Sequence, residues 1–232
     1  MTIALLLSGG TGSRLGEDIP KQYLEVCGKP MISYCIRALS EHPDIDGIQI
    51  VAAKDWQEQL RLWMEEADGN RKFRGFSGPG ETRQLSILNG LRDVRAYASE
   101  EDAVLIHDAA RPLLSGKLIT ECLTALCGHD GVLPVLPMKD TVYYSEDGKQ
   151  VSRLLNRSRL YAGQAPEAFV LGSYLKANER LLPTEIYSIN GSTEPAVLAG
   201  LDVVMIPGDE GNFKVTTKAD LERLEEVLRG KK

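Results

Sequence analysis

The sequence predicts an α/β protein built on a doubly wound, mostly parallel β-sheet. Two features of the 232 residues support this fold class. Apolar runs of strand length alternate with segments of helical apolar periodicity along most of the chain, as in a succession of βαβ crossovers. Glycines or polar residues follow two of these runs directly, as loops at the carboxyl ends of parallel strands do. We interpret residues 1–232 as a single domain, because no repeat, low-complexity stretch or long linker interrupts them.

The first part of the chain supplies most of the expected elements. The expected strands are the apolar runs at residues 3–7, 48–53, 73–76, 103–107 and 131–136. The expected helices cover residues 30–39, 57–66, 82–91 and 118–126. Pro30 starts the first helix, whose apolar positions Ile32, Ile36 and Leu39 share one face, and this spacing is typical of a buried stripe.

The alternation breaks at residues 141–151, which predict a β-hairpin. Asp147 and Gly148 stand between short β-prone runs, a pattern that favours a two-residue type I′ turn. We therefore expect a β-arm at residues 138–160, inserted in the domain. Such an arm often mediates dimerisation, and a surface excursion explains the pattern equally well.

The α/β pattern then returns to the end of the chain. We expect a helix at residues 171–180, an apolar segment at 195–201 and a strand at 203–206. The last helix covers residues 219–229. Thr217 and Asp220 predict a capping box at its start, with Asp in place of the usual Glu.

Composition excludes several classes of protein. The formal net charge of −6 argues against a general nucleic-acid binder, which is normally basic. No apolar run approaches the length of a membrane span, and the N-terminus lacks the basic start of a signal peptide. The cysteines form no C-x-x-C pair, so we expect reduced thiols and a cytoplasmic protein.

The glycine-rich turn after the first strand predicts a binding site for a polyphosphate, such as a nucleoside triphosphate. Glycines let backbone N–H groups approach a ligand closely, and Arg14 and Lys21 add positive charge. A Walker A loop is excluded because Glu17 follows Gly16. A dinucleotide fingerprint is disfavoured because its third glycine comes one position late. The pattern G-G-x-G-x-R-[LM]-G followed by P-K, typical of nucleotidyltransferases, fits in full; the alternative is an ordinary turn with solvated charges.

The loops at 8–14 and 108–111 should share one crevice at the carboxyl ends of their strands. Four further segments carry polar residues suited to substrate binding or catalysis. These segments are residues 78–86, 107–112, 156–166 and 212–217. Together with the glycine loop they stand in the order found in a known family. The chain resembles, over nearly its whole length, the cytidylyltransferases that make CDP-linked polyols, namely the methylerythritol-phosphate enzyme of isoprenoid synthesis and the ribitol-phosphate enzyme of teichoic-acid and capsule synthesis.

This resemblance implies a Rossmann-like nucleotidyltransferase fold and a Mg²⁺-dependent transfer of CMP from CTP to a small polyol phosphate, with release of pyrophosphate. It also implies a homodimer. The acidic net charge and the lack of a membrane-length apolar run lead us to expect neither nucleic acid nor membrane as a partner. The reaction needs no general base, because a phosphate monoester is already mostly ionised at neutral pH, its second pKa being about 6. It needs positioning and neutralisation of charge, which agrees with a chain that has only three histidines.

The resemblance also assigns roles to residues. Arg14, Lys21 and Lys214 would be the catalytic cations, and Asp108 would hold the metal. The acceptor would contact Arg111, Thr141 and Arg157, some of them across the dimer. The nucleotide would contact residues of the glycine loop and of two later segments: Ser8, Gly9, Gly10, Thr11, Gly12, Gly78, Gly80, Ser86 and Ala109.

Simpler interpretations of these residues stay open. Lys214 could be a solvated loop lysine, and Asp108 a turn residue. Ser86 could simply belong to the first turns of a helix. Arg157 could pair with an acid such as Glu167. His107 is interpreted as a packed, hydrogen-bonded residue at a strand end.

The sequence departs from the family pattern at two places. The loop that reads T-D-[EA] in the family, where it touches the acceptor, is replaced by residues 189–195, without an Asp at the expected position. Ala165 and Glu167 stand where the family often has Thr and Gln. The identity of the polyol therefore stays open, as do two alternatives: a sugar-phosphate nucleotidyltransferase that uses UTP or another triphosphate, and a non-catalytic nucleotide-binding relative.

Overall fold

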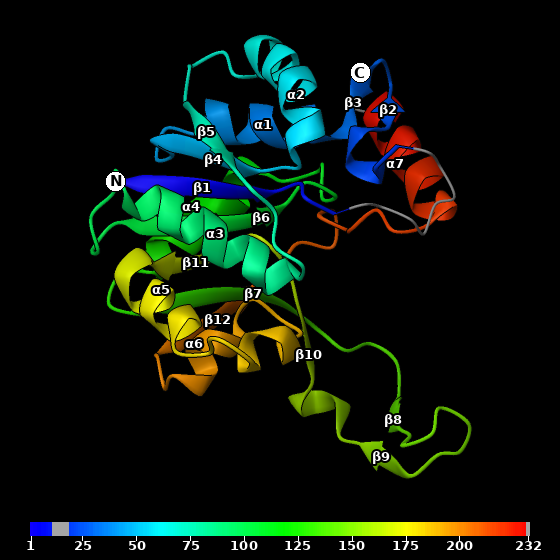
Figure 1. The fold of residues 1–232 in the computed structure, drawn as a ribbon. Coiled ribbons are helices and arrows are strands. Elements are labelled where there is room, and N and C mark those ends of the chain that lie inside the picture. Colours follow the sequence, from blue (N-terminus) through cyan, green and yellow to red (C-terminus); the bar gives the residue numbers. More distant parts are fainter. Residues whose placement is uncertain (11–18, 231–232) are drawn as a thin grey trace.

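The core of the protein is one twisted β-sheet with helices on both faces (Figure 1). The computed structural model describes residues 1–10 and 19–230. Within these residues the sheet has eight strands, in the order β10-β7-β11-β6-β1-β4-β5, with β12 also paired to β7. The expected doubly wound α/β architecture is confirmed.

Parallel pairing builds the first half of the sheet. The strand β1 (Thr2–Leu7) lies between β4 (Gly47–Val51) and β6 (Ala103–Asp108), and β5 (Phe73–Ser77) adds to β4. Leu7 is in register with Val51 on one side and Asp108 on the other. The carboxyl ends of β1 and β6 therefore lie side by side, which places the glycine loop next to Asp108.

The second half of the sheet is mixed. The strand β11 (Glu167–Val170) runs antiparallel between β6 and β7 (Gly131–Pro137). The strand β10 (Tyr161–Gly163) pairs antiparallel with the end of β7 on the same edge as β11, and β12 (Val203–Pro207) pairs parallel with β7 along the opposite edge. The sequence analysis did not predict β10 and β11.

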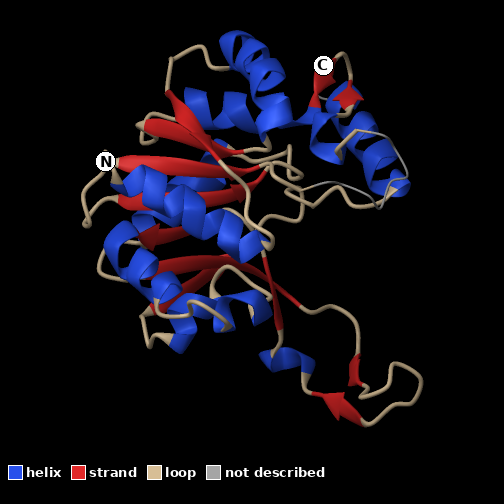
Figure 2. Cartoon of the chain, viewed as in Figure 1, coloured by secondary structure: helices blue, strands red, loops and turns tan. Residues whose placement is uncertain are grey.

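Helices cover both faces of the sheet, as the red strands between blue helices in Figure 2 show. One apolar core contains side chains of α1 (Met31–Glu41), α2 (Lys54–Ala67) and α4 (Gly116–Ala125). A second core contains side chains of α3 (Arg83–Arg95), α5 (Leu171–Glu179) and α6 (Glu194–Leu198). Burial of these two faces supplies the main driving force for folding.

A smaller unit borders the glycine loop. It consists of the 3-10 helix η2 (Lys21–Tyr23), the strands β2 (Glu25–Val26) and β3 (Lys29–Pro30), and α7 (Lys218–Gly230). Val26, Met31, Val215 and Leu224 form its core. The predicted capping box is confirmed, because the Asp220 amide donates to the Thr217 hydroxyl at 3.2 Å and the Thr217 amide donates to the Asp220 carboxylate at 2.8 Å.

The expected β-arm projects from the body of the protein (Figure 1). Its strands β8 (Val142–Tyr144) and β9 (Arg153–Leu155) are antiparallel, and the 3-10 helix η3 (Arg157–Arg159) follows them. The prediction of a two-residue turn is wrong, because a longer loop joins the strands and Asp147 accepts hydrogen bonds from the amides of Lys149 and Gln150 instead. A further 3-10 helix, η4 (Glu185–Ser188), follows α5. None of the helices that the structure describes is long and apolar enough to span a membrane.

Candidate active site

A pocket of about 450 Å³ opens at the carboxyl ends of β1 and β6. Five charged side chains contribute to its lining, three of them cationic. The lining residues are Leu7, Gly9, Gly10, Lys21, Gln22, Gly80, Glu81, Thr82, Arg83, Ser86, Asp108, Ala110 and Lys214. The expected crevice shared by the glycine loop and the end of β6 is thus present in the described part of the chain.

Side chains of η2 hold the start of the glycine loop in place. Gln22 Nε2 donates to the carbonyls of Ser8 and Gly10, at 2.8 and 2.7 Å. The Tyr23 hydroxyl donates to the Ser8 carbonyl at 3.0 Å. A Cβ on Gly9 would lie 2.6 Å from the Pro79 Cβ, so a glycine is needed where the two loops meet.

The N-terminus of α3 forms the opposite wall. Thr82 caps the helix by accepting a hydrogen bond from the Leu85 amide. Ser86 Oγ accepts from the Gly80 amide at 3.0 Å and donates to the Thr82 carbonyl at 2.9 Å. The side chain of Ser86 thus belongs to the first turn of the helix and also lines the pocket, so its predicted contact with the nucleotide stays a prediction.

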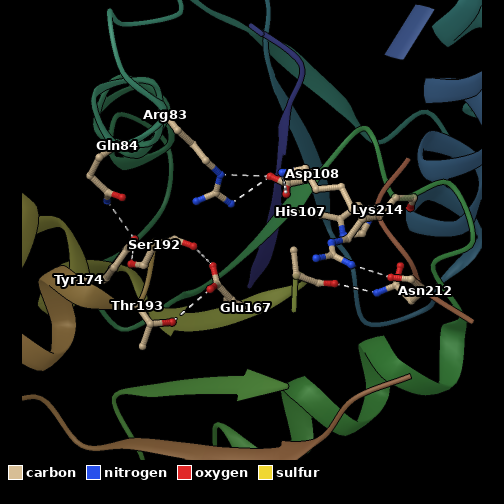
Figure 3. A network of polar contacts seen from close by, with 12 residues as sticks. Arg83, Gln84, His107, Asp108, Glu167, Tyr174, Ser192, Thr193, Asn212 and Lys214 are labelled. Atoms are coloured by element: carbon tan, nitrogen blue, oxygen red, sulfur yellow. Dashed lines mark hydrogen bonds and ion pairs between the residues drawn. The ribbon is translucent and has the colours of Figure 1, made fainter. Parts of the chain in front are cut away.

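Asp108 is the electrostatic centre of the pocket (Figure 3). Its Oδ1 accepts two hydrogen bonds from Arg83, at 3.2 and 3.0 Å, and its Oδ2 accepts one from Lys214 Nζ at 2.8 Å. Burial opposes ionisation, but the positive charges of Arg83 and Lys214 outweigh it and hold the pKa of Asp108 well below its usual range. The carboxylate is therefore ionised and shared by two cations.

The loop that carries Lys214 is fastened to both sides of the pocket. Lys21 Nζ donates to the Val215 carbonyl at 2.7 Å, and the Val215 amide donates to the Ala110 carbonyl at 2.8 Å. Asn212 is fully buried and donates to the Ala165 carbonyl at 2.7 Å. Lys21 and Lys214, which are far apart in the sequence, are held at one site by these contacts.

His107 is not a candidate catalyst. It is fully buried, and its Nε2 donates to the Arg111 carbonyl at 3.0 Å. Burial lowers the pKa of His107 to about 4, so the imidazole is neutral at physiological pH. This agrees with its interpretation as a packed residue at a strand end.

The structure brings together most of the described residues that were predicted for the nucleotide and the chemistry. Gly9, Gly10, Lys21, Gly80, Ser86, Asp108 and Lys214 line the pocket. Ser8, Gly78 and Ala109 belong to the same loops without lining it. Thr11, Gly12 and Arg14 lie outside the described residues. The roles assigned to all of them stay predictions.

The predicted acceptor residues are placed differently. Arg111 packs beside the pocket and donates to the Asn212 carbonyl at 2.7 Å. Thr141 and Arg157 are exposed on the β-arm and do not line the pocket of this chain. Arg157 donates to the Lys139 carbonyl at 2.7 Å. Its suggested pairing with Glu167 is wrong, because Glu167 is buried among Ser192 and Thr193.

Six of the residues that line the pocket were not predicted for the site, and two of them make contacts that shape it. Arg83 donates two hydrogen bonds to Asp108, and Gln22 donates to two backbone carbonyls of the glycine loop. Gln22 directly follows Lys21, and Arg83 lies between Gly80 and Ser86 in the segment 78–86. Their positions within those segments were the available signal, but only the tertiary contacts show their partners.

Asp108 also suits a cation brought by a substrate. Among the residues that the structure describes, no group of three or more His, Cys, Asp or Glu side chains could hold a metal by itself. Mg²⁺ commonly binds through one or two carboxylates together with substrate phosphates and waters. A carboxylate offers about four lone-pair sites, so Asp108 keeps acceptor capacity beside Arg83 and Lys214, and the donor set fits a phosphate-bound Mg²⁺.

The fold, the glycine loop and the pocket of convergent cations define a nucleotidyltransferase. A family model described as 2-C-methyl-D-erythritol 4-phosphate cytidylyltransferase matches residues 2–230, and the chain belongs to this family. Its curated relatives are enzymes, so the non-catalytic alternative is set aside.

Individual relatives agree with this assignment. The chain is 37% identical to the 2-C-methyl-D-erythritol 4-phosphate cytidylyltransferase of Nitrosomonas eutropha, over 98% of this chain and 96% of that protein. It is 36% identical to the enzyme of the same name from Rubrobacter xylanophilus, over 97% and 94% of the two chains. Among solved structures, the 4-diphosphocytidyl-2C-methyl-D-erythritol synthase of Anaerococcus prevotii superposes with a TM-score of 0.83 at 26% identity, covering 98% of this chain and 96% of that one.

Proposed function

We propose that this chain transfers CMP from CTP to 2-C-methyl-D-erythritol 4-phosphate and releases pyrophosphate, a step of isoprenoid synthesis. The observation that carries the proposal is the convergence of Lys21, Lys214 and Asp108 on one pocket beside the glycine loop. The relatives of similar length bear the name of this activity. The departures at Glu167 and in the loop at 189–195 leave ribitol 5-phosphate to be tested as a second acceptor.

The reaction balances without an added base. A phosphate oxygen of the acceptor forms a bond to the α-phosphorus of CTP, and the bond from that phosphorus to the bridging oxygen breaks. The electron pair leaves with pyrophosphate. Because the attacking phosphate is mostly ionised at neutral pH, the protein contributes alignment of the two substrates and stabilisation of negative charge in the transition state.

Lys21 and Lys214 are positioned for that stabilisation. Both line the pocket, and their ammonium groups are compact point charges suited to phosphoryl oxygens. Lys214 contacts Asp108 at 2.8 Å, and its ammonium group can bind a phosphate oxygen on the side that faces away from this carboxylate. Arg14 is proposed to act with them. Asp108 would be the protein ligand of Mg²⁺, and the bound cation would supply positive charge to the phosphates.

The acceptor site is proposed to be completed by a second copy of the chain. Thr141 and Arg157 lie on the projecting arm, outside the pocket of their own chain. The arm also exposes apolar side chains, among them Tyr143, Val151 and Leu154. A partner that covers these side chains would bring Thr141 and Arg157 to its own pocket, where the guanidinium can bind a phosphate through two hydrogen bonds.

All four cysteines are free, which supports action in the reducing cytoplasm.

The proposal is tested by measuring pyrophosphate release with Mg²⁺ for each of the four nucleoside triphosphates and a panel of polyol phosphates. We expect turnover with CTP and 2-C-methyl-D-erythritol 4-phosphate, and loss of turnover in K21A. A preference for UTP, or for ribitol 5-phosphate, would replace the proposed substrates. Near-normal rates in K21A would contradict the role of that lysine.

The arm is tested separately. We expect R157A to raise the KM for the polyol phosphate while the KM for CTP changes little. We expect L154E, which places a charge in the exposed apolar surface, to shift the protein from dimer to monomer in sedimentation experiments. A monomeric wild-type protein with full activity would overturn the proposed dimer.

A further inference from the structure

A buried carboxylate lies behind the pocket and takes no part in the proposed reaction. Glu167, at the start of β11, is 7% exposed. Its Oε2 accepts a hydrogen bond from the Ser192 hydroxyl, and its Oε1 accepts one from the Thr193 hydroxyl at 3.1 Å (Figure 3). Because burying a carboxylate is unfavourable unless donors replace water, these two hydroxyls are what allow Glu167 to occupy this position.

The two hydroxyls belong to residues 190–194, which we call the acceptor loop because the corresponding family loop touches the acceptor. Two further contacts fix this loop. The Tyr174 hydroxyl donates to the Ser192 carbonyl at 2.5 Å, and the Asn190 amide donates to the Glu194 carboxylate at 2.8 Å. Asn190 and Gly191 stay exposed. Glu167 thus ties the loop directly to the central sheet while leaving its tip open to a ligand.

Arg83 lines the pocket and interacts electrostatically with Glu167, without a hydrogen bond between them. Burial opposes the charge of Arg83, but Asp108 and then Glu167 favour it, and the pKa of Arg83 is raised. Burial raises the pKa of Glu167, and the charge of Arg83 acts against this rise. Arg83 therefore stands in the field of two carboxylates, one in the pocket and one behind the acceptor loop.

The contact also joins the two places where the sequence departs from the family pattern. One is Glu167 in place of Gln, and the other is the loop without its expected Asp. These departures lie far apart in the sequence, but Glu167 touches Ser192 and Thr193 directly. The two departures from the family pattern therefore meet at one pair of hydrogen bonds.

We propose that Glu167 is a positioning residue that holds the acceptor loop against β11 and thereby sets the affinity for the polyol phosphate. The inference rests on the proposed function and deepens it. Glu167 is buried and is not among the residues that line the pocket. Its removal leaves Ser192 and Thr193 without their acceptor, and the loop then loses its attachment to the sheet beside Arg83.

The experiment compares E167A, E167Q and T193V with the wild type, using CTP and 2-C-methyl-D-erythritol 4-phosphate or whichever polyol phosphate the wild type accepts. We expect E167A to raise the KM for the polyol phosphate on the order of tenfold, because a small displacement of a positioning group strongly weakens the alignment of a bound substrate. The KM for CTP should change by less than about twofold. T193V, which removes one of the two donors, should act in the same direction with a smaller factor and keeps the test open should E167A fold poorly.

E167Q distinguishes positioning from a purely structural effect. Its amide is close in shape to the carboxylate, and it can accept from one hydroxyl and donate to the other, so we expect it to restore the acceptor KM to within about threefold of the wild type. The matched control is E179Q. It removes an exposed carboxylate on α5 that pairs with Arg92, a residue of the same helix as Arg83. Its KM values should equal those of the wild type.

Three outcomes would overturn the inference: an unchanged acceptor KM in folded E167A, an equal rise of both KM values, or an E167Q that is as impaired as E167A. These outcomes are distinct from failure of the proposed function, which would appear as a wild-type protein that turns over no polyol phosphate. Thermal unfolding of each variant, measured in parallel, identifies any that do not fold.

Discussion

Replacing Asp108 by Asn should tighten the binding of metal-free polyphosphates while it abolishes efficient turnover. Asp108 accepts hydrogen bonds from Lys214 at 2.8 Å and from Arg83 at 3.0 Å. These are the cations that an incoming polyphosphate also needs. The carboxylate therefore competes with the substrate for these two cations, and removal of its negative charge should favour the binding of anions.

The magnitude follows from these distances. A phosphate oxygen bound to the far side of Lys214 at a similar distance would lie about 5.6 Å from the Asp108 oxygen. Two unit charges at this separation repel each other by about 3 kcal/mol at an effective dielectric constant of 20, and by about 0.7 kcal/mol in water. Lys214 and Arg83 are each more than a third exposed, so solvent and salt reduce the effect to about 1 kcal/mol, which is about fivefold in affinity.

Calorimetric titration of D108N with pyrophosphate and with CTP, in the presence of a chelator, measures this effect directly. Binding should be tighter than in the wild type, and the difference should shrink at high salt. With Mg²⁺, pyrophosphate release should fall by about a hundredfold or more, because a group that organises transition-state charge is lost. E179Q, with the same change in net charge far from the pocket, controls for non-specific effects. Weaker or unchanged binding of metal-free pyrophosphate by D108N would refute the reasoning.

Three further predictions concern other parts of the site and the fold. K214A should lower kcat on the order of 10² to 10³-fold, and a wild-type kcat in a pyrophosphate-release assay would contradict its role. G80A should raise the KM for CTP several-fold, because its Cβ would lie 2.3 Å from the Leu85 Cβ and 2.8 Å from the Leu85 carbonyl carbon; the control is G69A, which meets no neighbour within 4 Å. D220A should destabilise the protein at neutral pH by about 1 kcal/mol through loss of the α7 cap, measured by urea unfolding. Burial opposes ionisation of Asp220, but hydrogen bonds from Thr216 and Thr217 outweigh it and lower its pKa to about 2. The cap's contribution is therefore complete above the ordinary carboxyl pKa and disappears as the pH falls towards about 2; a difference between D220A and wild type that persisted at that pH would exclude this explanation.

The parallel half of the sheet could be predicted because its signals are local. β1, β4 and β6 are apolar runs buried on both faces, which the sequence displays directly. β10 and β11 could not be predicted in the same way. They contain three and four residues, and β11 begins with a charged residue. Their strand conformation depends on pairing with β6 and β7, and these partners are distant in the sequence.

In the site, too, local sequence signals could be predicted and contacts between distant segments could not. The rule that ligands bind at the carboxyl ends of parallel strands was enough to place Gly10 and Asp108 at one crevice. It could not assign Arg83 to Asp108, because that contact depends on how the N-terminus of α3 packs across the sheet. Nor could it show that Glu167 meets the acceptor loop, since a hydrogen bond between side chains 26 positions apart, Thr193 and Glu167, leaves no periodic signal.

The shared position of Asp108 has a consequence for the whole catalytic cycle. Without Asp108, the cations Lys21, Arg83 and Lys214 would bind pyrophosphate more tightly. Because catalysis requires differential stabilisation of the transition state, tight binding of the product would slow turnover. Because Asp108 contacts both Lys214 and Arg83, it can serve as their counter-ion while the product leaves. Under the proposed function, Asp108 would lower the positive charge that holds the product, and the slow step of D108N should include release of pyrophosphate.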